Sequence, residues 1–486
     1  MRKSIIMQSL ITSALYVLLG CASVSTTLEA QGNRAQVSGQ YTQIMGEIFS
    51  FIQSHYVDEV EPKALFEGAM TGMFEALGDV HSSYLTEKDM ADLSDTTEGE
   101  FGGVGLYISK PTTGTDGKPP YVEVASPIED TPGWRAQINP GDLILEINGQ
   151  ATDTMTMDEV LAILRGKVGE QVTLLIRRGA KLEFPVTLTR AIIEVPTTKA
   201  ALIGDIGYLK LLTFTPHTVE RAKEALSDFK AQNYKALILD LRNNYGGLLN
   251  SAIGICDLFL DGGVVVTTKS RIPSENATFT ARRSTTVPSD MPVIVLINQG
   301  SASASEIVAG ALKDRNRAYL VGEKSFGKGS VQQVFPLDKA GFKITVARYY
   351  TPSDVNIDKI GIPPDREILF PEWTDADAES LSKLIEANTV RSFVEANPQA
   401  TPAEINRLAL RLSAEYKLDQ SLLLRFIRNE QNRTAIAPIY DLEYDVQLQE
   451  AVNILKAGTY STLMKTAKTL HELQEEAEQD ELAIAS

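Results

Sequence analysis

The feature that most constrains the fold is a pattern of strands and helices in the middle of the chain. Ala236–Leu241 is almost continuously apolar, which is typical of a strand buried on both faces of a parallel sheet. A further strand is predicted over Pro292–Asn298, and helices are predicted after the two strands, over Leu248–Leu260 and Ser305–Lys313. Because alternating strands and helices favour a parallel sheet, we expect residues 195–370 to form an α/β domain.

Each of these strands ends in a turn of small and polar residues that leads into a helix. The first turn is Asp240–Leu248 (DLRNNYGGL), and the second is Asn298–Glu306 (NQGSASASE). Such turns lie at the carboxyl ends of strands, where α/β sheets bind ligands, and the N–H groups of a helix start favour negative charge. Two such N–H groups are able to form an oxyanion hole, so we expect the functional site at these turns.

One serine and one lysine are candidates for catalysis. Ser303 lies in the second turn, and Lys328 follows 25 residues later between two glycines. A serine hydroxyl needs a base to take its proton, and with only four histidines in 486 residues a lysine is the more available base. The same residues also fit ordinary structural roles, because Ser303-x-x-Glu306 is a capping box and most lysines are solvated. From the residues alone, both interpretations stay open.

Residues 101–190 have a different pattern. Phe101–Leu106 (FGGVGL) leads into a strand, and Pro140–Gly149 (PGDLILEING) precedes a predicted helix over Thr156–Arg165 and a strand over Gln171–Arg177. This order resembles a PDZ domain of the bacterial, circularly permuted kind. The resemblance implies a domain that takes a C-terminal peptide as an added strand and captures its carboxylate on backbone N–H groups.

The PDZ resemblance also implies which residues bind that carboxylate. They are Gly103, Val104, Gly105 and Leu106, where the glycines let the backbone approach a ligand. The alternative is a tight glycine-rich turn without a ligand. Arg165 is a candidate regulatory residue that links the PDZ helix to the catalytic domain, or else a cation that stabilises a helix C-terminus.

The N-terminus has the pattern of an export signal. Two basic residues precede the apolar stretch Ile5–Leu19, and the stretch ends in Leu18–Cys21 (LLGC), which resembles a bacterial lipobox. The resemblance implies cleavage before Cys21 and lipidation of its thiol; the alternative is an ordinary secretory peptide. Residues 1–20 are therefore predicted to be a lipoprotein-type signal peptide and residues 21–40 a flexible tether.

Two further regions, residues 41–97 and 373–486, are predicted to be helical. The first is either a small domain packed on the core or a dimerisation arm. A net charge of −17 argues against nucleic-acid binding, which needs a basic patch. The histidines have no paired metal-ligand spacing, so we expect neither a metal site nor another cofactor.

Three motifs and the PDZ pattern together resemble the carboxy-terminal processing (tail-specific) proteases, over about residues 40–370. The motifs are Leu239–Leu248 (LDLRNNYGGL), Gly300–Asp314 (GSASASEIVAGALKD) and Gly322–Gln332 (GEKSFGKGSVQ). The resemblance implies a crotonase/ClpP-like α/β protease core with an inserted PDZ domain and helical N- and C-terminal regions. Residues 373–435 look like an insertion before another family-like segment, Tyr444–Ala451.

The family resemblance implies a role for each candidate residue. Ser303 would be the nucleophile, Lys328 the general base, and Gln332 the residue that orients the lysine. The oxyanion hole would consist of N–H groups of Gly246, Gly247 and Ala304. A free lysine has a pKa of about 10.4, so a lysine base needs burial to favour its neutral form. A glutamine is able to accept a hydrogen bond from that lysine without adding a negative charge.

The resulting hypothesis is an exported serine endopeptidase of the bacterial cell envelope that recognises exposed C-terminal tails through its PDZ domain. Its expected partners are protein substrates, a membrane through the lipid anchor, and further copies of the chain. Whether it also needs an adaptor protein is left open. The alternatives are an inactive PDZ scaffold lipoprotein, or acyl-CoA chemistry on a crotonase-like core.

Overall fold

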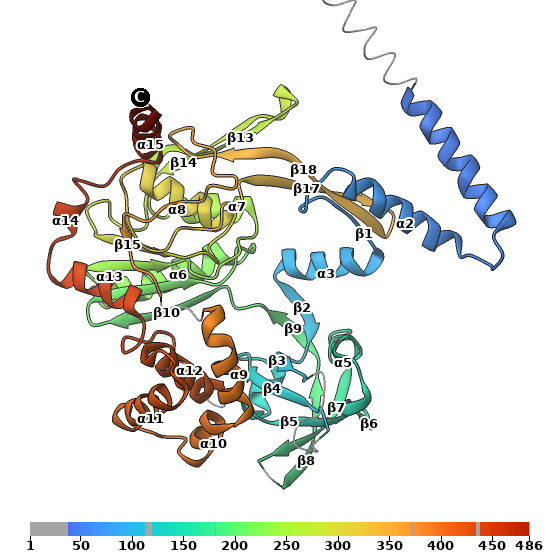
Figure 1. Cartoon of the computed structure of the whole chain (residues 1–486), viewed down its shortest axis with the longest axis horizontal. Helices are drawn as coiled ribbons and strands as arrows, with labels where there is room; N and C mark the ends of the chain where they lie inside the picture. The colour runs from blue at the N-terminus through green and yellow to red at the C-terminus, as the bar shows by residue number, and fades with distance from the viewer. Residues whose placement is uncertain (1–36, 112–118, 180, 371–373, 434–437, 486) are drawn as a thin grey trace, which may run out of the picture. The chain divides into compact units, whose positions relative to one another are not determined.

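The structure, a computed structural model, describes residues 37–111, 119–179, 181–370, 374–433 and 438–485 (Figure 1). The predicted signal peptide and Cys21 lie outside the described residues, as does most of the tether. The chain divides into two compact units. The first comprises Met1–Thr86 and Val334–Ile344, and the second comprises Glu87–Gln333 and Thr345–Ser486.

The first unit is built around two helices and a short strand pair. One helix covers residues 37–55, and α2 (Pro62–Glu75) begins with its proline in the first turn. Strand β1 (Ser83–Leu85) pairs antiparallel with residues 341–343. The apolar stripe of the first helix, which includes Ile48 and Phe51, is exposed at 54% and 62% for these two side chains.

The PDZ region is a six-stranded sheet in the order β3-β4-β5-β7-β8, with β6 paired to β5. Its strands are β3 (Leu106–Ser109), β4 (Val122–Pro127), β5 (Leu143–Ile147), β6 (Gln150–Ala151), β7 (Gln171–Arg178) and β8 (Leu182–Thr189). Alternate residues of β7 are buried, and they share a core with Ile138, which follows the short helix α4 (Pro132–Arg135), and with residues of α5 (Met157–Leu164). Thr156 caps α5 in a capping box with Glu159, so the predicted helix is confirmed.

Two antiparallel strands connect the PDZ region to the rest of the second unit. Strand β2 (Glu100–Gly103) enters the region and β9 (Ala191–Glu194) leaves it, and the two pair with each other. Helix α3 (Glu87–Glu98) precedes β2. The PDZ region is therefore an insertion whose two ends lie side by side.

The α/β region contains a six-stranded sheet in the order β10-β11-β12-β15-β16-β19, parallel except for β10. The strands are β10 (Thr198–Ile203), β11 (Ile206–Leu211), β12 (Ala236–Asp240), β15 (Val293–Ile297), β16 (Tyr319–Gly322) and β19 (Arg366–Glu367). Every residue of β12 and β15 is buried, as the apolar pattern predicted. Successive side chains point to opposite faces, so both faces of this sheet are covered.

Helices cover the two faces. Helices α6 (Thr218–Ala231), α7 (Leu249–Cys256) and α8 (Ala304–Asp314) pack with the odd-numbered residues of β12 and β15. Helix α13 (Val446–Lys456) packs with the even-numbered residues of β12 and β15. Helix α7 is shorter than predicted, because the chain leaves it through a turn at residues 257–260. Phe259 in this turn is still buried, which is why the apolar pattern continued past the helix end.

An antiparallel sheet that the sequence patterns did not predict lies beside this region. It contains β13 (Asp261–Ser270), β14 (Ala277–Arg283), β17 (Ser330–Leu337) and β18 (Ala340–Tyr350). In the second unit, residues 347–350 of β18 pair with β13. Gln332 lies near the start of β17, and Thr345, to which its side chain donates a hydrogen bond, lies in β18.

The C-terminal region is helical, as predicted. Its helices before α13 are α9 (Ala378–Glu386), α10 (Thr389–Ala396), α11 (Pro402–Tyr416) and α12 (Gln420–Arg433), and they share one apolar core (Figure 1). A capping box of Thr401 and Glu404 starts α11. Helices α14 (Tyr460–Leu463) and α15 (Leu470–Ala485) follow α13.

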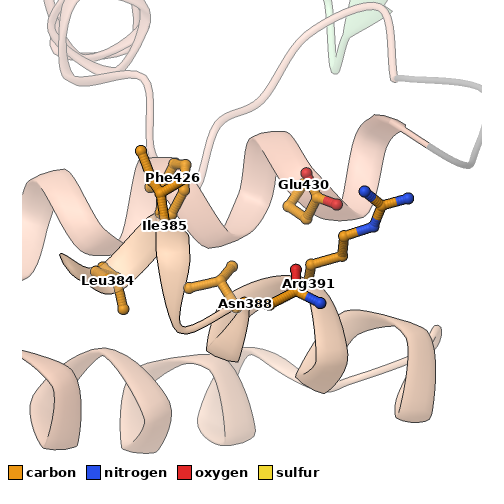
Figure 2. A pocket seen from close by; sticks show the side chains of 7 residues that line it. Leu384, Ile385, Asn388, Arg391, Phe426 and Glu430 are labelled. Carbon is orange, nitrogen blue, oxygen red and sulfur yellow. The ribbon is translucent and has the colours of Figure 1, made fainter. Parts of the chain in front are cut away.

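A cavity of about 330 Å³ opens between α9, α10 and α12. Figure 2 shows Leu384, Ile385 and Phe426 at one end of it and Arg391 and Glu430 at the other. None of these residues belongs to the predicted catalytic turns. Among the described helices, none combines the length and the apolar character that crossing a membrane requires.

Candidate active site

Ser303 occupies a strained position between β15 and α8. Its backbone angles are φ 56° and ψ −114°, a region that non-glycine residues rarely adopt, and it is the N-cap residue of α8. The same strand–turn–helix arrangement places the nucleophile in α/β-hydrolases, where strain holds the hydroxyl out of the helix. The turn therefore starts helix α8, and its strained backbone also fixes the position of the Ser303 side chain.

The hydrogen bonds separate the three serines of this turn. Ser301 Oγ donates to the Leu241 carbonyl oxygen at 2.9 Å, and Ser305 Oγ donates to the Asn244 carbonyl oxygen at 2.7 Å. Both are completely buried, whereas Ser303 is 9% exposed. Ser301 and Ser305 thus tie the turn to the neighbouring one, and Ser303 is the most exposed of the three serines.

Two glycines bring the first turn against Ser303. Gly246 and Gly247 have φ values of 104° and 141°, and a Cβ on Gly246 would lie 2.8 Å from Ser303 Cβ and 2.9 Å from Ala304 N. A Cβ on Gly247 would lie 2.2 Å from the Phe214 carbonyl oxygen. Only glycine fits such positions, because a side chain would collide with backbone atoms.

The N–H groups of this pair of turns are not equivalent. The Gly246 N–H donates to Asn244 Oδ1 at 2.9 Å. Within the described residues, the N–H groups of Gly247 and Ala304 donate to no other residue. Of the three predicted oxyanion-hole residues, these two therefore have a donor to offer.

The Lys328 loop is held by close backbone packing. Gly327 has φ 89°, and a Cβ there would lie 2.9 Å from Gly361 N; a Cβ on Gly329 would lie 2.5 Å from Asp358 N. Lys328 itself is half-buried. The two glycines thus permit a tight approach to the loop at residues 358–361.

Glu306 joins the serine turn to the lysine loop. Its Oε2 accepts from the backbone N–H of Ser303 and of Lys328, both at 2.8 Å. Its Oε1 accepts from Ser325 Oγ and from the Gly327 N–H, both at 2.6 Å. Burial raises the pKa of the Glu306 carboxyl, and these four hydrogen bonds oppose the rise without cancelling it. The capping-box pattern indicated Glu306, but its contact with the lysine loop was missed.

Gln332 lies near the start of β17 with its amide fixed. Its Nε2 donates to Ser330 Oγ at 2.9 Å and to Thr345 Oγ1 at 3.1 Å. Both bonds use the amide nitrogen, so the amide oxygen is the group able to accept from an amine. Gln333 is exposed, as expected for the next residue along a strand.

A buried polar network lies beside the glycine turn. Arg242 Nε donates to Asp240 Oδ1 at 3.0 Å, and Arg242 Nη2 donates to Asp240 Oδ2 at 2.7 Å. Burial alone would raise the pKa of Asp240, but the Arg242 charge and hydrogen bonds outweigh it and lower this pKa to about 2. The same guanidinium contacts Asp445 and Gln447, which sequence reasoning had marked only as part of a family-like segment.

The PDZ candidate loop connects β2 to β3. The Val104 carbonyl oxygen accepts from the Gly133 N–H at 2.8 Å, and the Gly105 carbonyl oxygen accepts from the Ile128 N–H at 2.9 Å. These bonds hold the loop by its carbonyl groups. Gly103 and Leu106 are residues of β2 and β3.

Arg165 is the C-cap residue of α5, and it contacts the segments that lead into the PDZ region. Its guanidinium carbon lies 4.9 Å from the Phe101 ring centroid, and Nη1 lies 3.8 Å from Asp92 Oδ1. Asp92 belongs to α3 and Phe101 to β2. These contacts connect the PDZ helix to the entry strand and its preceding helix.

Three family models match the chain. "Peptidase family S41" matches residues 205–368, "PDZ domain" matches residues 123–178, and "Activating protease CtpB N-terminal domain" matches residues 13–89. The first match contains both strand-to-helix turns and Lys328.

Curated relatives agree with these models. A carboxy-terminal-processing protease of Bartonella bacilliformis is 41% identical over 326 residues, which are 66% of this chain and 73% of that protein. A carboxyl-terminal-processing protease of Synechocystis sp. is 38% identical over 320 residues, which are 64% of this chain and 73% of that protein. The solved photosystem II D1 C-terminal processing protease is 30% identical, covers 67% of this chain and 92% of its own, and has a TM-score of 0.40.

The S41 fold with a PDZ domain defines this protein as a serine peptidase. The chain belongs to the carboxy-terminal processing protease family.

Proposed function

We propose that this protein cleaves polypeptides with Ser303 as the nucleophile and Lys328 as the general base. The observation that carries the proposal is the single carboxylate oxygen, Glu306 Oε2, which lies 2.8 Å from the backbone nitrogens of both residues. It brings the backbone of the strained serine turn next to the backbone of the lysine loop. Gln332 supports this assignment, because its amide oxygen is able to accept from an amine.

In the proposed reaction, Ser303 Oγ attacks the scissile carbonyl carbon while its proton passes to the neutral Lys328 amine. The carbonyl oxygen becomes an oxyanion that accepts from the N–H groups of Gly247 and Ala304. Collapse of this intermediate breaks the C–N bond, and the protonated lysine returns the proton to the leaving amine. Water then repeats the sequence on the acyl-enzyme, which releases a carboxylate and restores the serine.

The proposed substrates are cell-envelope proteins with exposed C-terminal tails. The PDZ fold supports this class, because such domains capture a terminal carboxylate on backbone N–H groups, here in the loop from Gly103 to Leu106. The signal-like N-terminus and Cys21 support export and a lipid anchor in the envelope. The exposed apolar stripe on the helix over residues 37–55 supports self-association.

Two variants test the chemistry, with peptide substrates that carry an apolar C-terminal tail. Ser303→Ala and Lys328→Ala are each expected to lower kcat at least about 1,000-fold, since nucleophile and base act as a unit. The matched control is Lys324→Ala, because Lys324 is an exposed lysine of the same loop and its loss should leave kcat near that of the parent protein. Full hydrolysis by either catalytic variant would show that the mechanism is wrong.

The same assay decides between the proposal and its alternatives. An inactive scaffold would bind tail peptides but cleave none, even with the parent sequence. Acyl-CoA chemistry would require coenzyme A to bind, which isothermal titration measures directly. Cleavage upstream of the tail by the purified protein, together with no coenzyme A binding, supports the protease.

A further inference from the structure

Gln447 of α13 connects the starts of the two loops that carry the proposed catalytic groups. This side chain is completely buried. Its Oε1 accepts from Arg242 Nη1 at 3.0 Å, and its Nε2 donates to Glu323 Oε1 at 3.2 Å. Arg242 begins the turn that leads to Gly247, and Glu323 begins the loop that leads to Lys328. One amide therefore joins both loops from the far end of the chain.

Asp445 holds the same turn through Arg242. Arg242 Nη1 donates to Asp445 Oδ1 at 2.8 Å, and Nη2 donates to Asp445 Oδ2 at 2.7 Å. Asp445 also caps α13, because its Oδ1 accepts from the Leu448 N–H at 2.9 Å. With Asp240 on its other side, the planar guanidinium has its orientation fixed by two carboxylates.

Helix α13 itself is anchored independently of these loops. Its apolar residues pack on the sheet, and Gln447 Nε2 also donates to the Ile368 carbonyl oxygen at 2.8 Å. Glu323 is fixed by a further bond, from the Phe370 N–H to its Oε1 at 2.9 Å. The bridge thus runs from a rigid element to two irregular loops, which is the arrangement expected of supporting residues around a site.

We propose that Gln447 and Asp445 are positioning residues for peptide hydrolysis, and that they hold the oxyanion-forming turn and the lysine loop in catalytic register. This inference rests on the proposed roles of Ser303 and Lys328. A misplacement of about 1 Å at a reacting group is able to cost about 100-fold in rate, so a bridge remote from the substrate can control kcat. Neither residue contacts the substrate, so KM should change little.

The test uses the full-length protein, a tail-bearing peptide, and a fluorophosphonate that labels the nucleophilic serine. Gln447→Ala is expected to lower kcat and the labelling rate about tenfold or more, with KM within twofold. Gln447→Glu keeps an acceptor for Arg242 but removes the donor to Glu323, so a similar loss is expected. The matched control is Gln449→Ala, because Gln449 lies on the same helix and donates to the Leu442 carbonyl oxygen instead.

If Gln447→Ala fails to fold, Asp445→Ser replaces it, because serine keeps a helix cap while it removes the Arg242 contact. The same loss of kcat with unchanged KM is expected.

The outcomes separate this inference from the proposed function. Ser303→Ala and Lys328→Ala are measured alongside; hydrolysis by either of them would overturn the proposed mechanism. If both are inactive, but the Gln447 variants match Gln449→Ala or change KM alone, the bridge has no positioning role.

Discussion

At the scale of single residues, Glu306 shows how one side chain takes on two tasks. It completes the helix start at Ser303, as its sequence position predicts, and its other hydrogen bonds fix the backbone of the lysine loop. The first task is local in sequence and could be predicted from the capping-box spacing. The second depends on a contact with a loop 19 to 22 residues away, which no local pattern encodes.

Replacing this carboxylate tests the second task. Glu306→Gln turns one acceptor oxygen into a donor that faces two donors, so we expect the free energy of unfolding to fall by about 3 kcal/mol. We expect kcat to fall at least about tenfold, because both loops lose a shared support. The matched control is Glu404→Gln at the exposed capping box of α11, which should cost no more than about 0.5 kcal/mol. Equal effects in both variants would refute the assigned role.

The pH dependence of stability gives a second readout. Because the pKa of Glu306 is raised above its usual 4.5, the folded state binds this proton more tightly than the unfolded state. The stabilisation that the protonated Glu306 carboxyl gives to the folded state is therefore fully present below about pH 4.5. It is lost as pH rises through the folded-state pKa of Glu306. Glu306→Gln should remove this part of the slope in chemical denaturation measured from pH 4 to 7. An unchanged slope would contradict the raised pKa.

At the scale of elements, the two strand-to-helix turns were predictable, whereas their mutual contact was not. Continuous apolar runs predicted strands β12 and β15, and the small and polar residues that follow each run predicted the turns. That Gly246 faces Ser303, and that Gly246 gives its own N–H to Asn244, depends on how the two turns pack. The antiparallel sheet of β13, β14, β17 and β18 was missed because its strands are only partly buried, so their apolar pattern is weak.

The glycine turn gives a prediction at this scale. In Gly247→Ala the new Cβ would collide with the Phe214 carbonyl oxygen, so the turn must shift and displace the proposed oxyanion donor. We expect kcat to fall at least about 100-fold, the usual effect of losing one donor. The matched control is Gly204→Ala: Gly204 also has a positive φ, of 69°, but nothing lies within 4 Å of the added Cβ. That variant should cost about 1–2 kcal/mol of stability and leave kcat intact.

At the scale of the whole molecule, we predict that copies of the chain associate through the helix over residues 37–55. Of the two interpretations of residues 41–97, the exposed stripe on the helix over residues 37–55 favours an association surface, since its apolar side chains are exposed among the described residues. The predicted domain boundaries, export signal and anchor stay predictions, and the anchor lies outside the described residues.

The association surface can be tested by one charge. Ile48→Asp places a carboxylate in the stripe and is expected to lower the oligomeric mass in light scattering, because burying an unpaired charge is costly. Gln53→Asp adds the same charge to an exposed position of the same helix outside the stripe and should leave the mass unchanged. An identical mass for all three proteins would rule out this surface.

The sequence by itself determined many of the elements of this protein, because apolar periodicity and turn residues are properties of short segments. Its resemblance to a known family indicated the PDZ region and the candidate catalytic groups. Only the tertiary structure showed that the hydroxyls of Ser301 and Ser305 donate to backbone carbonyl oxygens and that the Gly246 N–H donates to Asn244. It also decided that Gln447, 119 residues after Lys328 in the sequence, braces the loop that leads to Lys328. Each of these results depends on which polar groups form hydrogen bonds with one another. Buried polar groups find their hydrogen-bond partners only when the chain is packed.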